Sequence, residues 1–287
     1  MTAEKSDGPR IMTENDVREL RPVGPDHRLS YGTDPEQFGD LYLPMQPGPH
    51  PLLILLHGGC WRARYGLEYL GQLCAAFRNE GVAVWNLEYR RLGNGGGWPT
   101  TFEDVAAGTD FLRSIAGRFS LDLSRVVAAG HSAGGHLALW LAGRHRLPET
   151  SPLLSADALP VGGVVSLAGI PDLAEGVKCG ICSKACRELL AGPPEEAPDR
   201  YRQASPAELL PLGVPQWHLI GLLDRDIPVD YLQRYVAAAK QQDEVHLELI
   251  PDAGHYELIV PAAPAWSSVR RAVLRLLQRT QNRDASL

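Results

Sequence analysis

A short apolar run, a G-x-S-x-G sequence and a helical pattern follow one another without a break between Val126 and Trp140. The run is typical of a buried strand, and the alanine- and leucine-rich stretch after the motif favours a helix. Gly130 and Gly134 lack the Cβ atoms that would collide where strand and helix come close. The arrangement predicts that Ser132 lies in a strained turn, with its hydroxyl beside the amino end of a helix.

Strand-like and helical segments alternate from residue 52 onward. Residues 52–56 are apolar at every position, which indicates a strand buried on both faces. Alternation of this kind predicts an α/β fold with a mostly parallel sheet and helices on both faces. We expect strands at 52–56, 82–87, 126–129, 163–167, 214–220 and 245–250, and helices at 67–80, 101–118, from 133, at 229–240 and at 264–281.

Three further segments complete the expected organisation. Residues 1–20 are polar and predict a flexible lead-in, with one domain over residues 21–287. Segments 29–33 and 38–43 predict an antiparallel hairpin before the alternation begins. Residues 170–213 have no clean periodicity and carry several prolines, so we expect a small cap insertion there.

Composition excludes several function classes. The chain has 287 residues, a formal charge of −6 and acids interspersed with bases, which argues against a nucleic-acid or polybasic membrane surface. No apolar run approaches the ~20 residues of a membrane span. The amino terminus has no apolar signal region, so the expected location is cytoplasmic. Five cysteines, an odd number, do not predict a disulfide framework.

A serine nucleophile needs a base and an orienting acid. His255 is the best base, because it lies in a loop just past the last expected strand. Asp224 is the best acid, three residues past the glycine that ends the strand before. Asp226 is the alternative acid, and either aspartate could instead be a solvated turn residue. The order serine, aspartate, histidine suits this type of sheet.

The reaction also needs N–H donors for the oxygen that gains negative charge. Ala133, the residue after the serine, would supply one backbone amide. The sequence His-Gly-Gly-Cys-Trp at 57–61 follows a buried strand and would supply the second. We assign it to Gly59 and Cys60, with Gly58 as the runner-up.

Three cysteines stand close together at Cys179, Cys182 and Cys186. Their spacing could hold a metal or an iron–sulfur cluster, but no fourth ligand lies nearby. Free thiols, or one incidental disulfide, are favoured, and we expect neither a metal nor an organic cofactor. Cys60 would be sensitive to oxidation if its thiol is accessible.

The sequences HGGCW, GHSAGG, GLLDRDIP and DAGHY, in this order, resemble the α/β-hydrolase superfamily. The resemblance is greatest to the esterase and arylformamidase group, which has an HGGxW oxyanion motif. It implies about eight strands, of which the second is antiparallel. The family pattern G-x-x-D-x-x-V/I-P falls on Gly221, Asp224, Ile227 and Pro228, which favours Asp224 over Asp226.

This resemblance implies a serine hydrolase that cleaves a carboxylic ester through an acyl-enzyme. The alternatives are an arylformamidase or other small-amide hydrolase, a peptidase, and a non-catalytic binding protein. The chain lacks the length for the propeller that related peptidases carry, and silent relatives usually lack a triad member. The expected partner is a small ester or amide, with no nucleic acid or membrane; a homodimer is left open.

Overall fold

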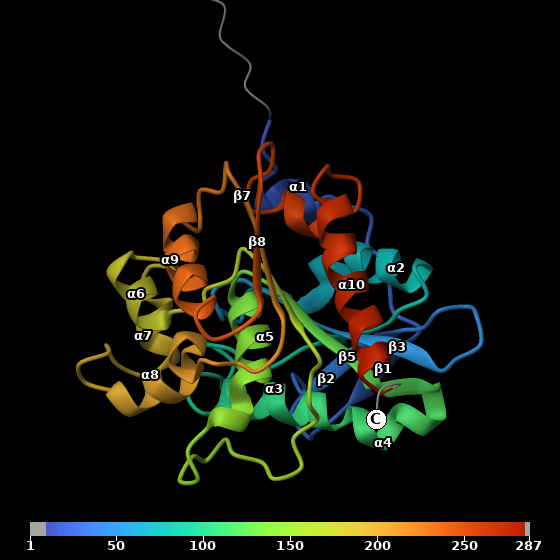
Figure 1. Ribbon diagram of the computed structural model, residues 1–287, viewed down its shortest axis with the longest axis horizontal. Helices are drawn as coiled ribbons and strands as arrows, with labels where there is room; N and C mark the ends of the chain where they lie inside the picture. Colours follow the sequence, from blue (N-terminus) through green and yellow to red (C-terminus); the bar gives the residue numbers. More distant parts are fainter. Residues whose placement is uncertain (1–9, 285–287) are drawn as a thin grey trace, which may run out of the picture.

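The computed structural model describes residues 10–284 and builds them around one eight-stranded sheet (Figure 1). The strand order is β1-β2-β4-β3-β5-β6-β7-β8. β2 pairs antiparallel with both β1 and β4, and the other pairs are parallel, which confirms the expected sheet. The strands are β1 His27–Ser30, β2 Phe38–Tyr42, β3 His50–Leu56, β4 Ala83–Leu87, β5 Leu121–His131, β6 Val164–Leu167, β7 Gln216–Gly221 and β8 Val245–Ile250.

Helices cover both faces of the sheet, and the central strands are buried accordingly (Figure 1). Residues 52–56 of β3 are fully buried, as their unbroken apolar run predicts. α2 (Gly71–Asn79) and α10 (Trp266–Asp284) lie on one face, where Phe77 packs edge-on against Trp266. α3 (Thr100–Asp110), α5 (Ala133–Gly143) and α9 (Val229–Ala239) lie on the other.

Two expected helices are interrupted. The helix expected at 67–80 opens as a 3₁₀ turn, η1 (Leu67–Leu70), before α2. The helix expected at 101–118 divides into α3 and α4 (Leu112–Phe119). The Trp85 indole N–H donates a hydrogen bond to the carbonyl oxygen of Gly108. In a continuous helix that oxygen would accept the backbone amide four residues later. Ser114 donates both its amide and its hydroxyl to the carbonyl of Phe111, which completes the break.

The amino-terminal segment contains a short helix that its sequence pattern does not predict. α1 (Glu14–Arg18) opens with a capping box between Thr13 and Asp16, and it buries Val17. Residues 1–9 of the expected lead-in lie outside the described residues.

The segment between β6 and β7 has no strand among its assigned elements. It holds three short helices, α6 (Leu173–Lys178), α7 (Ala185–Leu189) and α8 (Pro198–Ala204). The 3₁₀ turns η2 (Arg144–Arg146), η3 (Pro206–Leu209) and η4 (Glu257–Ile259) complete the assigned elements.

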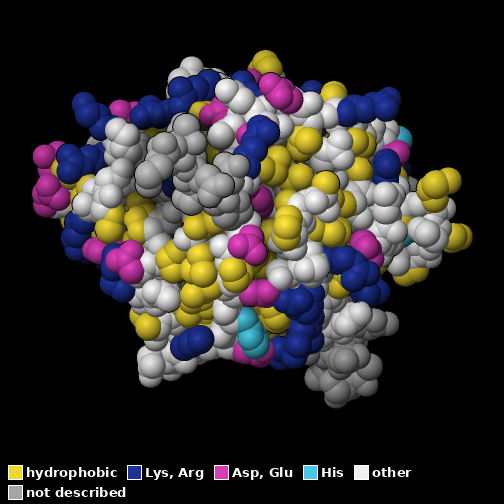
Figure 2. Space-filling model, turned by 90° about the horizontal axis from the view of Figure 1, so that it is seen from above, with side chains coloured by type: hydrophobic (Ala, Val, Ile, Leu, Met, Phe, Trp, Pro, Cys, Tyr) yellow, Lys and Arg dark blue, Asp and Glu magenta, His cyan; other side chains and the backbone are white. Residues whose placement is uncertain are grey.

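The surface carries both charges. On the face seen in Figure 2, basic, acidic and hydrophobic side chains are mixed. None of the helices in the described part of the chain combines the length and the apolar composition that crossing a bilayer requires.

Candidate active site

Ser132 occupies the sharp turn between β5 and α5. Its backbone angles, φ 55° and ψ −120°, are rare for a residue with a side chain. The turn needs both flanking glycines: a Cβ on Gly130 would lie 2.1 Å from the carbonyl oxygen of Gly134, and one on Gly134 would lie 2.0 Å from that of Leu56. The Ser132 amide donates to Leu167 at 2.8 Å, which fixes the turn to β6. The strained turn expected from the sequence is therefore present.

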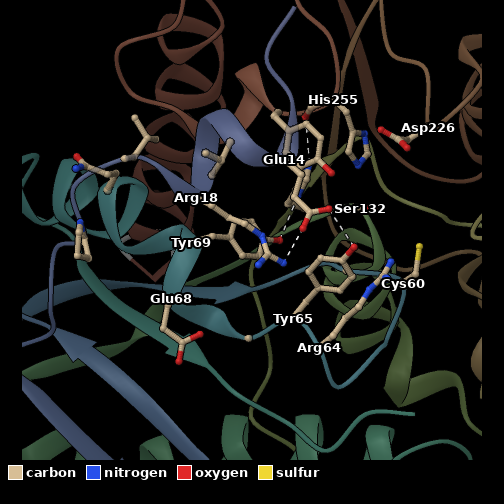
Figure 3. Close-up of a pocket in the computed structure, with 18 of the residues that line it drawn as sticks. Glu14, Arg18, Cys60, Arg64, Tyr65, Glu68, Tyr69, Ser132, Asp226 and His255 are labelled. Carbon is tan, nitrogen blue, oxygen red and sulfur yellow. Dashed lines mark hydrogen bonds and ion pairs between the residues drawn. The ribbon is translucent and has the colours of Figure 1, made fainter. Parts of the chain in front are cut away.

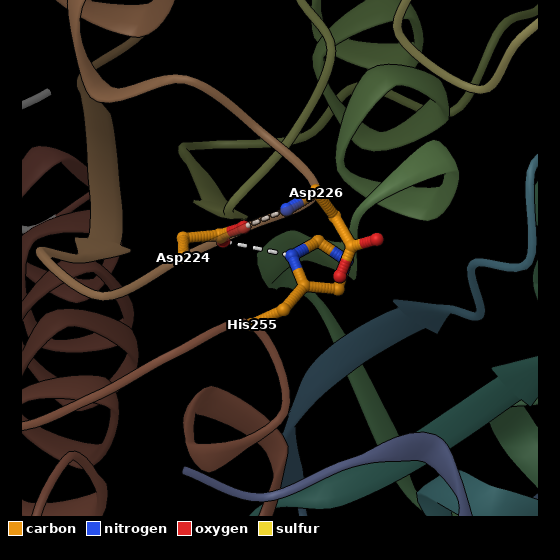
Figure 4. Close-up of side chains that lie close together, drawn as sticks. All are labelled: Asp224, Asp226 and His255. Atoms are coloured by element: carbon orange, nitrogen blue, oxygen red, sulfur yellow. Dashed lines mark hydrogen bonds and ion pairs between the residues drawn. The ribbon is translucent and has the colours of Figure 1, made fainter.

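His255 and Asp224 meet although 31 residues separate them (Figure 4). His255 Nδ1 lies 2.8 Å from Asp224 Oδ2, and both side chains are almost completely buried. The other carboxylate oxygen accepts the amides of Asp226 (2.8 Å) and Ile227 (2.9 Å). A carboxylate only accepts hydrogen bonds, so the proton lies on Nδ1 and leaves Nε2 free to take another.

Asp226 has a different position from Asp224. It is exposed and lines the same cavity as His255, and its side chain lies close to the His255 ring (Figure 4). No hydrogen bond joins its carboxylate to the ring in the described part of the chain. Within residues 10–284, the group of side chains best placed to hold a metal ion is Asp224, Asp226 and His255, whose ligand atoms lie within 4.8 Å of one another. A metal there would compete for the same histidine and aspartate that the hydrogen bond already joins.

Three backbone amides near Ser132 are free to bind a substrate oxygen. Within the described residues, the N–H groups of Gly59, Cys60 and Ala133 donate to no protein acceptor. The Gly58 amide is already engaged, because it donates to the Tyr69 hydroxyl at 2.6 Å. We therefore leave Gly58 out of the donor set.

A buried ionic network lies under the oxyanion loop, residues 57–61. His57 stacks on Tyr89 with ring centroids 4.4 Å apart, and its Nε2 lies 2.8 Å from Glu88 Oε1. The Arg91 guanidinium reaches the same carboxylate at 3.0 Å. Burial alone would raise the pKa of Glu88, but the neighbouring His57 and Arg91 outweigh it and lower that pKa. His57 thus orders the loop and lies outside the cavity.

Tyr69 and His131 link the oxyanion loop to the histidine loop. The Tyr69 hydroxyl accepts the Gly58 amide and lies 3.3 Å from His131 Nδ1. His131 Nε2 lies 3.1 Å from the carbonyl oxygen of His255. Burial lowers the pKa of His131 well below its usual value, so the ring stays neutral. A neutral ring has one donor nitrogen and one acceptor nitrogen, so it can bond to both the Tyr69 hydroxyl and the His255 carbonyl.

A cavity of about 490 Å³ opens over Ser132 and His255. Its outer wall is the amino-terminal segment, where Glu14 accepts a hydrogen bond from Tyr65 (3.0 Å) and pairs with Arg18 (2.6 Å) (Figure 3). Sequence reasoning missed Glu14, Arg18, Tyr65 and Tyr69, since no motif marks them and α1 is too short to show a periodicity.

The cysteines differ from expectation. Cys60 and Cys182, which are 122 positions apart in the sequence, form a disulfide with their Cα atoms 5.5 Å apart. One disulfide is among the outcomes that the sequence favours, but the sequence indicates a thiol at Cys60 and does not predict its pairing with Cys182. Cys74 and Cys186 are buried free thiols and Cys179 is an exposed one, so the three clustered cysteines do not act as one ligand set.

The sheet order, the strained serine turn and the histidine–aspartate pair define an α/β-hydrolase with the parts of a serine triad. A family model described as BD-FAE matches residues 39–233. The chain belongs to this family of α/β-hydrolase esterases.

Individual relatives agree with this assignment. The chain is 30% identical over 246 residues to Esterase LipC of Mycobacterium tuberculosis, covering 79% of this chain and 59% of that protein. It therefore spans about three-fifths of the length of this curated relative. Esterase B of Lactobacillus rhamnosus superposes with a TM-score of 0.81 at 20% identity, covering 95% of this chain and 92% of that one. Thermogutta terrifontis esterase 2, phosphonylated by cyclosarin, gives 0.70 at 18% identity, covering 88% and 93%.

Proposed function

We propose that this protein is a carboxylesterase that works through a Ser132–His255–Asp224 triad. The observation that carries the proposal is the buried Asp224–His255 pair beside a serine in a strained turn, with serine and histidine lining one cavity. Membership of an esterase family and the likeness to a named esterase support it.

We assign a role to each group on this basis. Ser132 Oγ attacks the acyl carbon, and Nε2 of His255 takes the serine proton and returns it to the leaving alcohol. Asp224 holds the proton on Nδ1 and stabilises the imidazolium that forms. The amides of Gly59, Cys60 and Ala133 bind the oxyanion, and water activated by His255 then releases the acid.

The cavity suits a small-molecule ester. Its volume lies within the usual ~300–1,000 Å³ of such sites. Its wall combines apolar side chains such as Val17 and Leu20 with charged ones such as Glu14 and Arg18. We include residues 170–213 as the cap of this site, because Cys182 in that segment lines the cavity.

Hydrolysis of p-nitrophenyl acetate, butyrate and octanoate tests the proposal, with Ser132→Ala as the control. We expect turnover by the natural chain and a loss of at least about 10⁴-fold in Ser132→Ala, whose melting temperature should change little. A fluorophosphonate probe should label Ser132. A folded natural chain that neither turns over these esters nor takes the label would exclude a serine esterase.

Arylformamidase activity remains the second candidate, favoured by the HGGCW sequence alone, and N-formylkynurenine assayed beside the esters separates the two. We also propose that the partner is a small ester or amide and neither a nucleic acid nor a membrane, with a homodimer as a hypothesis. The cytoplasmic location remains a prediction, and the Cys60–Cys182 disulfide weighs against it, because such bonds persist mainly in oxidising compartments.

A further inference from the structure

The oxyanion loop has an unusual backbone conformation at the two residues whose amides are free and at the residue that follows them. Gly59, Cys60 and Trp61 have φ values of 98°, 51° and 52°, so three consecutive residues occupy the left-handed region. Only the first of them is a glycine, and side-chain-bearing residues enter this region at a cost. Such a backbone persists only where its surroundings hold it.

The two sides of the loop are held in different ways. Before Cys60, the Gly58 amide bonds to Tyr69 and His57 is fixed by Glu88. After it, the Trp61 side chain is fully buried and its carbonyl accepts the Leu92 amide at 2.8 Å. The amide of Cys60 itself has no protein acceptor within residues 10–284. Among these residues, its peptide unit is held only by the Gly59 carbonyl, which accepts the Arg62 amide at 3.0 Å, a turn inside the loop itself.

The disulfide joins this turn to a segment outside the loop. Its other end, Cys182, lies between α6 and α7. Ile181 before it and Ala185 and Cys186 after it are buried, with the exposed Ser183 and Lys184 between. The amide of Ile181 bonds to Gly176 at 2.9 Å, which gives this short segment a fixed base. Cys60 is therefore bonded to a well-packed part of the cap.

We propose that the Cys60–Cys182 disulfide positions the Cys60 amide in the oxyanion hole, so that full esterase activity requires the oxidised form. This inference rests on the proposed esterase function. Cys182 is then a positioning residue, which acts through Cys60 and touches no reacting atom.

The same bond makes the site sensitive to thiols. Both cysteines line the cavity and are only partly buried, so a small dithiol can reach them. A thiolate of the dithiol attacks one sulfur and breaks the S–S bond, and its second thiolate then closes the reagent into a cyclic disulfide. Cys60 and Cys182 together gain two electrons and two protons, and the reagent loses them.

Thiol counting establishes the starting state. Denatured, unreduced protein should take three equivalents of iodoacetamide, on Cys74, Cys179 and Cys186, and five after reduction. Alkylation of all five without reduction would overturn the proposal, because no disulfide would then exist.

Kinetics of Cys182→Ser test the positioning, with Cys179→Ser as the matched control in the same segment. Loss of an oxyanion donor costs about 10²–10³-fold in kcat, so a donor that is present but poorly aimed should cost about tenfold or more. We expect kcat and the rate of fluorophosphonate labelling to fall together in Cys182→Ser while KM stays within about twofold. Cys179→Ser should match the natural chain.

Reversible reduction covers the case in which Cys182→Ser does not fold. Dithiothreitol should lower kcat of the folded natural chain by the same factor, with near-ultraviolet circular dichroism retained, and reoxidation should restore it. Full activity with five free thiols, or loss only through unfolding, would overturn the positioning role. An oxidised natural chain without esterase activity would instead overturn the proposed function.

Discussion

Replacement of Asp224 by asparagine tests the triad most sharply, because the structure determines which way the new amide would face. One oxygen of Asp224 accepts the backbone amides of Asp226 and Ile227, at 2.8 and 2.9 Å. Asparagine has only one oxygen, and it must remain there to satisfy these two donors. Its NH₂ group then faces His255, where the carboxylate oxygen had been.

An NH₂ group opposite Nδ1 forces the wrong tautomer on His255. Nδ1 becomes the acceptor, the ring proton moves to Nε2, and the histidine can no longer take the proton of Ser132. The same tautomer defect in a serine protease triad lowers kcat about 10⁴-fold, which corresponds to about 5.5 kcal/mol of transition-state stabilisation. We expect a loss of this size.

The assay is kcat/KM on p-nitrophenyl acetate near neutral pH, with Asp226→Asn as the matched control. Asp226 is exposed and has no hydrogen bond to the ring in the described residues, so its variant should lose less than about threefold. Asp224→Asn should keep its melting temperature to within a few degrees, because both backbone bonds survive. A loss below about tenfold in Asp224→Asn, or a larger loss in Asp226→Asn, would refute the assignment of Asp224.

Two further predictions concern the amino-terminal segment and pH. The buried carboxylate of Glu257 accepts the amides of Met12 and Gly254. Glu257→Gln can accept only one of these hydrogen bonds, so the cavity wall should loosen and KM should rise about fivefold. Unchanged KM and unchanged proteolysis near residue 12 would contradict this. Burial lowers the pKa of His136 to about 4 and that of His218 to about 3. Between pH 6.5 and 4 only the unfolded state protonates these two rings. The free energy of unfolding should therefore decrease as the pH is lowered through this range, by up to about 1.4 kcal/mol per pH unit for each ring. Denaturant titrations at several pH values should show that the free energy of unfolding of His218→Gln depends less steeply on pH than that of the natural chain. An equal pH dependence would count against the reasoning.

The sheet and the positions of the three candidate catalytic residues could be predicted from the sequence, because each depends on a local pattern. Ser132, Asp224 and His255 each follow a strand, and parallel strands bring their carboxyl ends to one edge. His255 therefore reaches Asp224 and lines one cavity with Ser132, although the three are far apart in the chain. The antiparallel pairing of β2 with β1 follows from the hairpin pattern, whereas its antiparallel place in the larger sheet came from the family resemblance alone, since spacing does not determine it.

Features that depend on side-chain packing between distant segments leave no such pattern. The pairing of Cys60 with Cys182 joins residues 122 apart and cannot be deduced from five cysteines in a chain. Tyr69 reaches Gly58 and His131 only because η1 lies beside the oxyanion loop in the folded chain. α1 has five residues, too few for a periodicity. Its role as a wall of the cavity can be recognised only in the folded structure.

The free amide of Cys60 has a consequence for how this position can vary. A main-chain N–H is common to every residue except proline, so the side chain at position 60 is not needed to supply the donor. The chain can therefore use that side chain for a covalent tie without giving up any part of the oxyanion hole. Because the amide and the side chain of position 60 have separate roles, a cysteine could be introduced there in a related esterase with an HGGxW sequence. A second cysteine at the position of Cys182 would then form a disulfide that places activity under redox control.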